Sequence, residues 1–220
     1  MIDERNGFYQ RINVDKYESV YVVGDLHGCF DSLASELKSV NFNENTDLLI
    51  SVGDLIDRGE RSIDCLGLIK KPWFKAVRGN HEQMAISALL KRGGGFKDWI
   101  LNGGKWYLAL SDEDKERFKE LLQLAANLPL VIEVNVNGKK IVIAHADYPG
   151  DEYVFGADVD YIPLLWGRER LDSEVAHNIK GADLFLFGHT PVNNVIKRAN
   201  QEYIDTGVVF GRSLTLRKIK

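Results

Sequence analysis

Cysteine is scarce in this chain of 220 residues, which has only two thiols, Cys29 and Cys65, and no CxxC pair. A disulfide framework and a structural thiolate zinc site are therefore not expected. No apolar run approaches the ~20 residues that a membrane-spanning helix needs, and the first ten residues lack the apolar stretch of a secretory signal. Basic residues are not in excess, since 28 Lys and Arg face 32 Asp and Glu, for a net charge of −4. These absences predict a cytoplasmic protein with no nucleic-acid partner and no membrane association.

The chain does contain an alternation of short apolar runs and longer amphipathic segments, without an internal repeat or a linker. We expect residues 1–220 to form a single domain with an α/β or α+β fold. The apolar runs predict strands over residues 19–23, 46–54, 74–80 and 182–190, a hairpin over 130–147 that turns at Asn137-Gly138, and two or three strands in the tail 202–220. Amphipathic spacing predicts helices over 31–40, 61–70 and 81–92, the last ended by Gly93-Gly94-Gly95, and a mainly helical segment 96–128 capped by Ser111 and Asp114.

Polar side chains follow five of the apolar runs, at the point where each run breaks at a small residue. After Gly24 come Asp25 and His27, which point to the same side if the chain is still extended there. The later runs end in Asp54, Asp57 and Arg58, in Arg78, Asn80, His81 and Glu82, in His145, and in His189. Any one of these residues alone would more often be a cap, a turn residue or a buried structural side chain. Because ligand sites gather at the carboxyl ends of strands in α/β sheets, the whole set indicates one functional site.

Three motifs in the order "GDLHG", "GDLIDRG" and "GNHE", followed by isolated histidines, resemble those of the calcineurin-like metallophosphoesterases. The complete "DRG" and "GNHE" forms are similar to those of the serine/threonine phosphoprotein phosphatases, most closely to the bacteriophage and bacterial members of that family. The resemblance covers nearly the whole chain and includes "PWFKAVRGNHEQM", "LNGG", "HADYP", "RER" and "GADLFLFGHTP". It implies two mixed β-sheets packed as a sandwich and flanked by α-helices, with the helical segment 83–128 forming one wall of the substrate cleft.

The resemblance also implies a site for two divalent metal ions. Six residues match the family's ligands, namely Asp25, His27, Asp54, Asn80, His145 and His189. Asp25 and His27 would hold one ion. Asn80, His145 and His189 would hold the other, and Asp54 would bridge the two ions. Oxygen and nitrogen ligands without thiolate favour Mn²⁺, with Fe or Zn²⁺ as alternatives, over Ca²⁺. Two carboxylates leave such a site positively charged, and it would therefore attract a phosphate dianion.

Five further residues match catalytic or substrate-binding positions. His81 would act as the general acid for the leaving alkoxide, and Asp57 would orient it and favour its protonated form. Arg58 and Arg168 would bind the phosphate oxygens, with Arg78 as a weaker third choice. The nucleophile implied by the resemblance is a hydroxide that bridges the two metal ions, so no covalent phosphoenzyme is required.

The implied activity is dephosphorylation of phosphoserine and phosphothreonine in proteins, and the sequence does not choose between these and phosphotyrosine or phosphohistidine. A symmetrical dinucleoside tetraphosphate hydrolase of the same fold is the alternative. Such hydrolases resemble this chain at "GDLHGC" but tend to have alanine where Asp57 stands and "GNHD" instead of "GNHE", so Asp57 and Glu82 favour the phosphoprotein substrate. A non-catalytic scaffold is disfavoured, because every ligand position is filled. We further expect Glu82 at a helix N-terminus or behind the metal ligands, and His177, which has no motif context, on the surface.

Overall fold

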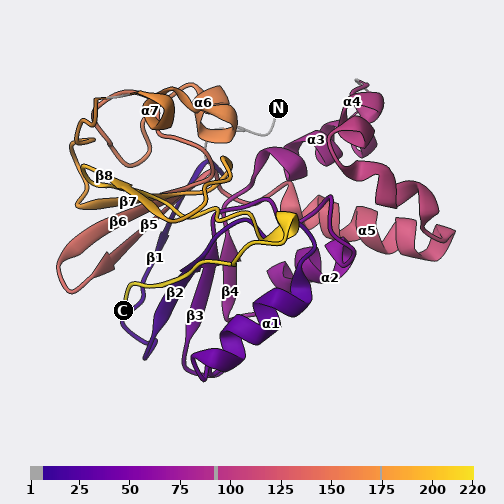
Figure 1. Ribbon diagram of the computed structural model, residues 1–220, viewed down its shortest axis with the longest axis horizontal. Helices are drawn as coiled ribbons and strands as arrows, with labels where there is room; N and C mark the ends of the chain where they lie inside the picture. Colours follow the sequence, from indigo (N-terminus) through magenta and orange to yellow (C-terminus); the bar gives the residue numbers. More distant parts are fainter. Residues whose placement is uncertain (1–6, 92–93, 174) are drawn as a thin grey trace.

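The computed structural model describes residues 7–91, 94–173 and 175–220, and its strands form two mixed β-sheets (Figure 1). The larger sheet has the order β1-β5-β6-β7-β9-β8, and the smaller has the order β10-β2-β3-β4. The strands of the larger sheet are β1 (Tyr9–Ile12), β5 (Val131–Val136), β6 (Lys139–Ala144), β7 (Leu184–Phe187), β8 (Ile196–Arg198) and β9 (Gln201–Tyr203). Those of the smaller sheet are β2 (Val20–Val23), β3 (Leu48–Ser51), β4 (Phe74–Ala76) and β10 (Leu216–Lys218).

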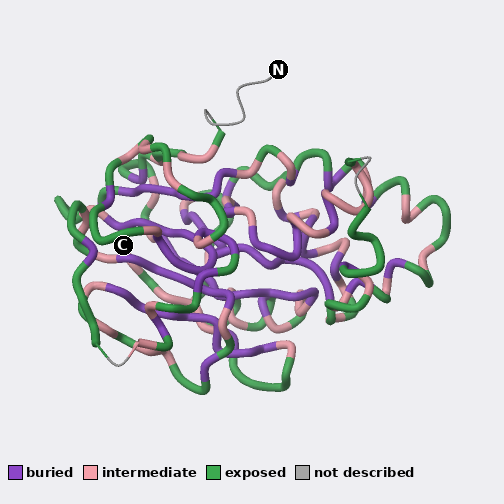
Figure 2. Tube along the Cα trace, turned by 90° about the horizontal axis from the view of Figure 1, so that it is seen from above, coloured by how far each residue is buried: buried purple, intermediate pink, exposed green. Residues whose placement is uncertain are grey.

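The two sheets pack face to face because their strands alternate between two apolar faces. In β2, Val20 and Val22 belong to the core between the sheets, whereas Tyr21 and Val23 face the helices outside. The strands β5, β6 and β7 send Ile132, Val134, Ile141, Ile143 and Leu186 into the same inner core. Side chains at alternate positions of a strand point to opposite faces, so strands that are apolar throughout can be covered on both. Figure 2 shows this layering as continuous buried chain through the centre of the molecule.

Helices cover the outer face of each sheet. On the smaller sheet lie α1 (Phe30–Ser39), α2 (Ser62–Gly67), α3 (Asn80–Leu89), α4 (Phe96–Leu101) and α5 (Asp112–Ala125), with short 3-10 helices at Leu68–Lys70 (η2) and Gly104–Ala109 (η3). The outer face of the larger sheet packs against α6 (Tyr161–Trp166) and α7 (Glu169–Asp172). A 3-10 turn, η4 (Val208–Phe210), precedes β10. The result is the sandwich with flanking helices that the sequence resemblance implied.

Most predicted elements are present, and the differences lie mainly at their ends. The hairpin is confirmed: β5 and β6 pair antiparallel, and Asn137 and Gly138 both have the positive φ that a tight turn requires. The strand predicted over 74–80 ends at Ala76, because the chain turns there toward α3. The predicted helix 81–92 is α3, while Arg92 and Gly93 lie outside the described residues.

The segment 96–128 is helical in three pieces rather than one. It breaks after α4 at Gly103, whose φ is 130°, and again at Leu110, which has an extended backbone. Ser111 caps α5 by accepting from the N–H of Asp114, as predicted. The strands β1 and β8 and the helices α6 and α7 were not predicted, because none exceeds six residues and none shows a clear period.

Among the described residues, no helix combines the length and the apolar character that a membrane crossing requires.

Candidate metal centre and catalytic site

Five strands end at one place, and each is followed by one or more of the polar residues singled out from the sequence. In the smaller sheet, β2 leads to Asp25 and His27, and β3 leads to Asp54, Asp57 and Arg58. Strand β4 leads to Asn80 and His81. Strands β6 and β7 of the larger sheet lead to His145 and His189. All but Arg58 are buried. The strand ends of both sheets therefore deliver their side chains to one centre.

The backbone at this centre is turned rather than extended. His27, Asp54, Asp57 and His189 all have positive φ, between 42° and 76°. The extended backbone that would place Asp25 and His27 on the same side is therefore not present, since β2 ends at Val23 and the chain turns at His27. Left-handed backbone at non-glycine residues costs roughly 1–3 kcal/mol each and persists only where the surroundings hold it. Here the turns aim the side chains inward.

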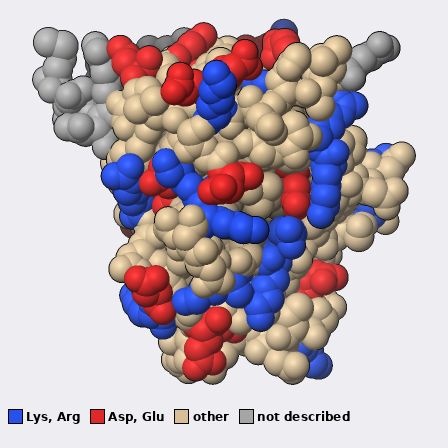
Figure 3. All heavy atoms as spheres, turned by 90° about the vertical axis from the view of Figure 1, so that its left-hand side faces the viewer, with Lys and Arg blue, Asp and Glu red and all other residues tan. Residues whose placement is uncertain are grey.

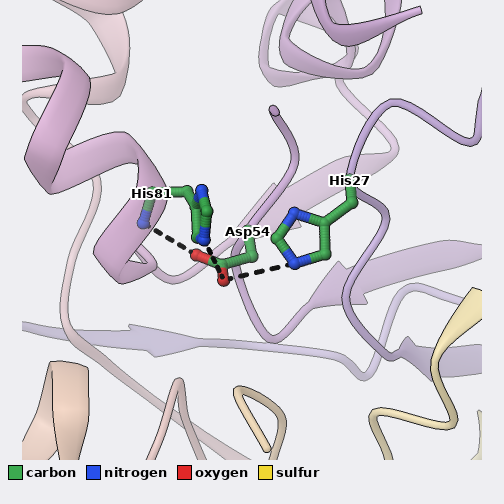
Figure 4. A group of neighbouring side chains, drawn as sticks. All are labelled: His27, Asp54 and His81. Atoms are coloured by element: carbon green, nitrogen blue, oxygen red, sulfur yellow. Dashed lines mark hydrogen bonds and ion pairs between the residues drawn. The ribbon is translucent and has the colours of Figure 1, made fainter. Parts of the chain in front are cut away.

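One potential ligand group consists of His27, Asp54 and His81 (Figure 4). The Nε2 atoms of His27 and His81 lie 3.6 and 3.9 Å from Asp54 Oδ2. His27 Nδ1 lies 2.9 Å from the carbonyl of Ile56, to which it donates, so its Nε2 presents a lone pair to the centre. This hydrogen bond fixes the ring in the way that backbone partners orient metal-binding histidines.

The second group consists of Asp54, His145 and His189, with the amide of Asn80 between the two rings. Asn80 Oδ1 lies 2.8 Å from His145 Nε2 and 3.0 Å from His189 Nδ1. His145 Nδ1 donates to the carbonyl of Val52, and its Nε2 lies 3.4 Å from Asp54 Oδ1. Asp54 thus turns one oxygen to each group, which is the geometry of a carboxylate placed to bridge two cations.

Asp25 lies beside His189 of the second group. Its two oxygens accept the backbone N–H of His189 at 3.2 and 3.1 Å. Burial, followed by the charges of Asp205 and Asp54, raises the pKa of Asp25 well above its ordinary range. Several carboxylates buried within one small region require positive charge nearby, and divalent cations would supply it.

The imidazoles are in the form that binds metal. Burial lowers the pKa of His27 to about 3, and it does the same for His189, where His145 adds to the effect. Burial also lowers the pKa of His145. Neutral imidazoles, an amide oxygen and carboxylates without thiolate form a donor set that suits divalent transition metals. The residues present therefore fit the two metal ions that the resemblance implies.

His81 differs from the other histidines because it pairs with a carboxylate. Its Nδ1 lies 2.7 Å from Asp57 Oδ2, and its backbone N–H donates to Asp54 Oδ1. Burial lowers the pKa of His81, but the charges of Asp54 and Asp57 outweigh this and hold that pKa above its ordinary value. His81 is thus set apart as a ring that can carry a proton at the edge of the centre.

Two arginines contact histidines of the cluster, one in each potential ligand group. An N–H of Arg58 lies 2.5 Å from His27 Nε2, and Arg168 Nε donates to His189 Nε2 at 3.3 Å. Arg78 is not brought to the cluster by its side-chain contacts. Its guanidinium donates to the carbonyl of Ala126, and it lines a separate cavity of about 390 Å³. His177 is exposed on the surface, as predicted.

Four further residues that sequence reasoning missed or left undefined support the centre. Glu82, at the start of α3, accepts the backbone N–H groups of Gly79, Asp54, Leu55 and Ile56 and so holds the turn after β3. Trp99 and Trp106 both donate to Asp57, and buried Asp205 lies close enough to Asp25 to raise its pKa. Only Glu82 carried a sequence signal, its place in "GNHE".

Comparison with known proteins agrees with this geometry. The family model for calcineurin-like phosphoesterases matches residues 19–193. Serine/threonine-protein phosphatase 2 of Salmonella typhimurium is 46% identical over 215 residues, which cover 96% of this chain and 98% of that protein. A symmetrical bis(5'-nucleosyl)-tetraphosphatase of Actinobacillus pleuropneumoniae is 47% identical, but over only 74 residues, 33% of this chain and 27% of that protein. A protein serine/threonine phosphatase structure from Saccharomyces cerevisiae superposes with a TM-score of 0.59 at 17% identity, over 91% of this chain and 71% of that one.

The two-sheet fold, with histidine and aspartate side chains clustered where they could hold metal ions, is that of a phosphoesterase. The chain belongs to the calcineurin-like phosphoesterase family, as its motifs predicted.

Proposed function

We propose that this protein is a phosphomonoesterase that uses two divalent metal ions to dephosphorylate phosphoserine and phosphothreonine in proteins. The observation that supports this most directly is the position of Asp54 between two ligand groups. Its oxygens lie 3.4 Å from His145 and 3.6 Å from His27. A carboxylate can bridge two metal ions in this position, whereas an imidazole cannot.

Both ions would be held by buried residues of this chain. Asp25 and His27 hold one ion, the second is held by Asn80 with His145 and His189, and Asp54 belongs to both. The donor set favours Mn²⁺, with Fe or Zn²⁺ as alternatives. Bound in this way, two such ions lower the pKa of a coordinated water and polarise the phosphoryl group.

The chain's own residues bind the phosphate and handle the proton. Arg58 and Arg168 reach the cluster from opposite sides, where their guanidinium groups neutralise the charge on phosphate oxygens. His81 keeps its Nδ1 on Asp57, so its Nε2 is the atom that delivers a proton to the departing alkoxide oxygen. Arg78 has no place in this proposal, because its contacts lie elsewhere.

The protein substrate is supported by two observations. A serine or threonine alkoxide is a poor leaving group, and the His81–Asp57 pair supplies the general acid that such a leaving group needs. A relative that is 46% identical over 98% of its own length is named a serine/threonine-protein phosphatase. The symmetrical tetraphosphatase matches over only a third of this chain, and an asymmetrical one from Bacillus subtilis matches over 88% of it but at 29% identity. Phosphotyrosine and phosphohistidine proteins are secondary substrates in this proposal.

We also propose that residues 1–220 act as one catalytic domain in the cytoplasm. Both sheets contribute ligands to one centre, which supports a single domain, and Cys29 and Cys65 are free thiols, as is usual in a reducing compartment. Figure 3 shows one face, on which Lys and Arg side chains form a band with Asp and Glu side chains beside it. The net charge of −4 supports the expectation that nucleic acid is not a partner.

Metal removal and re-addition tests the proposal. The protein is treated with a chelator, dialysed, and assayed with and without Mn²⁺ on p-nitrophenyl phosphate, a phosphoserine peptide and diadenosine tetraphosphate. We expect hydrolysis of the first two to depend on Mn²⁺ and diadenosine tetraphosphate to be a poor substrate. Activity that is unchanged by chelation would refute the metal mechanism, and preferential cleavage of the dinucleotide would refute the substrate class.

A further inference from the structure

Two tryptophan side chains from the segment after α3 meet the same buried carboxylate. Trp99 in α4 donates its indole N–H to Asp57, 2.9 Å from Oδ2 and 3.1 Å from Oδ1. Trp106 in η3 donates its indole N–H to Oδ1 at 2.8 Å. These residues come more than forty positions after Asp57 in the chain, so the contact depends on how α4 and η3 pack over the turn that follows β3.

The Asp57 carboxylate accepts hydrogen bonds from both indoles and from His81. Asp57 Oδ1 accepts from both tryptophans, whereas Asp57 Oδ2 accepts from Trp99 and from His81 Nδ1, the latter at 2.7 Å. Among the described residues, His81 is the only cationic side chain within ion-pair distance of Asp57. Neutral N–H donors fix the direction of a carboxylate without cancelling its charge, so that charge stays available to the imidazolium.

Both indole rings are themselves held firmly. Trp99 is fully buried and stacks on Phe118 at an interplanar angle of 7°, and Trp106 meets the same ring edge-on at 5.0 Å between centroids. The backbone of Asp57 needs such support, because it lies at a φ of 76° in the left-handed region. The carbonyl of Gly103, between the two tryptophans in the chain, accepts the N–H of Arg58.

We propose that Trp99 and Trp106 are positioning residues for the general acid: through Asp57 they hold the His81 ring in line with the leaving oxygen. This inference rests on the proposed role of His81. It assigns to the segment α4–η3 the support of the catalytic pair, in addition to the wall of the cleft that the sequence resemblance implied.

Substitution of phenylalanine for each tryptophan, which removes the N–H and keeps an aromatic ring, tests the inference. Trp106→Phe is the principal variant, because Trp106 is only half-buried, and Trp99→Phe is the second. Trp73→Phe is the matched control, since that buried indole also donates to a carboxylate, Glu44 Oε2 at 2.7 Å, away from the site. His81→Asn is the reference for complete loss of the acid.

The readout is kcat on substrates with different leaving groups. A phenolate with electron-withdrawing substituents leaves with little protonation, whereas a serine alkoxide does not. We expect Trp106→Phe to lower kcat on a phosphoserine peptide about 10-fold, a part of the ~10²–10⁴-fold effect of a general acid. We expect less than about a twofold change on p-nitrophenyl phosphate, with KM and bound Mn²⁺ unchanged, and the same selectivity but a larger loss in Trp99→Phe.

The outcomes separate the inference from the function on which it rests. If His81→Asn loses the peptide selectively and the tryptophan variants, folded by circular dichroism, lose both substrates equally or neither, the tryptophans are structural and the inference is overturned. If His81→Asn itself loses both substrates equally, the general-acid role fails first and the inference fails with it. A selective loss in Trp73→Phe of the same size would also overturn it.

Discussion

The two sheets contribute to one centre in different ways. The smaller sheet supplies Asp25, His27, Asp54, Asn80 and the catalytic pair, with its turns held by buried carboxylates and indole donors. The larger sheet supplies only His145 and His189, held by one backbone carbonyl, the Asn80 amide and the guanidinium of Arg168. In the proposed mechanism the smaller sheet would therefore carry the proton chemistry and four of the six metal ligands, whereas the larger sheet would complete the metal centre with the other two.

We expect Asp54→Asn to have the largest effect, because Asp54 is the residue that both potential ligand groups share. The amide keeps the shape but loses the charge and the ability to bridge. Since removing even an outer-shell partner costs about 10–100-fold in metal affinity or activity, we expect more than a ~10³-fold loss on every substrate. Bound Mn²⁺, measured by atomic emission after dialysis, should fall by at least one ion per chain.

The control for that experiment is Asp64→Asn, which removes a part-exposed carboxylate paired with Arg61 on α2. It should keep full activity and metal content. Retention of two tightly bound ions in Asp54→Asn would mean that each sheet holds its ion independently, and the bridging role would be wrong.

The two arginines come from different sides of the molecule, because Arg58 follows β3 of the smaller sheet and Arg168 immediately precedes α7, which packs on the larger sheet. We expect Arg58→Ala to lower kcat/KM about 10²–10³-fold, as loss of one charge-stabilising donor does. Arg168→Ala should cost less, about 10-fold, because the guanidinium of Arg58 lies over the Phe210 ring in addition to its contact with His27, whereas His189 is the one hydrogen-bond partner of the Arg168 side chain among the described residues.

Steady-state kinetics on a phosphoserine peptide measures both arginine variants. Arg11→Ala, which removes an exposed arginine paired with Glu133, serves as the control. An equal or larger loss in Arg168→Ala would show that phosphate binding is shared evenly by the two sides or dominated by the larger sheet.

Gly103→Ala tests how closely the segment α4–η3 must pack on the smaller sheet. A Cβ there would lie 2.8 Å from Arg58 Cγ and 3.3 Å from Asp57 Cβ, at a φ of 130° that alanine rarely adopts. We expect a loss of about 1–3 kcal/mol in the free energy of unfolding and a kcat about 5–10-fold lower on the phosphoserine peptide.

The matched variant is Gly150→Ala, because Gly150 also has a positive φ, 81°, but its Cβ would meet no atom within 4 Å. It should lose stability but not kcat. If both variants lose only stability, the packing of Gly103 on Arg58 does not matter for catalysis.

The sequence could predict which residues meet at the centre but not how the backbone presents them. Short apolar runs that each end in polar groups place Asp25, Asp54 and His145 at strand ends, because carboxyl ends of strands converge. The left-handed turn at His27 could not be predicted from an alternating pattern, since it depends on contacts with residues near Asp54. Local periodicity says nothing about contacts between distant segments.

The same limit explains why the indole donors were missed. Trp99 and Trp106 read as apolar positions of a helical segment, and nothing in their spacing indicates a hydrogen bond to Asp57. Arg78 shows a related limit: its place beside "GNHE" suggested a phosphate contact, which stays a prediction, and its guanidinium donates to the carbonyl of Ala126. Side-chain direction at the end of a strand depends on the turn that follows, which spacing alone does not give.

Glu202→Gln has the smallest expected effect and tests the link between the two sheets away from the centre. Glu202 in β9 of the larger sheet accepts from Arg217 in β10 of the smaller one at 2.9 Å, and Lys197 lies 3.3 Å away.

Burial raises the pKa of Glu202, but Arg217 outweighs it and lowers that pKa below its ordinary value. A carboxyl with a lowered pKa in the folded state stabilises the protein above its unfolded pKa, and this stabilisation is lost as the pH falls through the folded pKa. Because both cations are partly exposed, we expect Glu202→Gln to lower the free energy of unfolding by about 0.5–1 kcal/mol at neutral pH, measured by urea titration. The difference should disappear as the pH falls through the folded pKa of Glu202, where the wild-type side chain also becomes protonated. A difference that persisted at acid pH would show that Glu202 acts through packing, and the two sheets would then be joined by their shared apolar core without a measurable contribution from this ion pair.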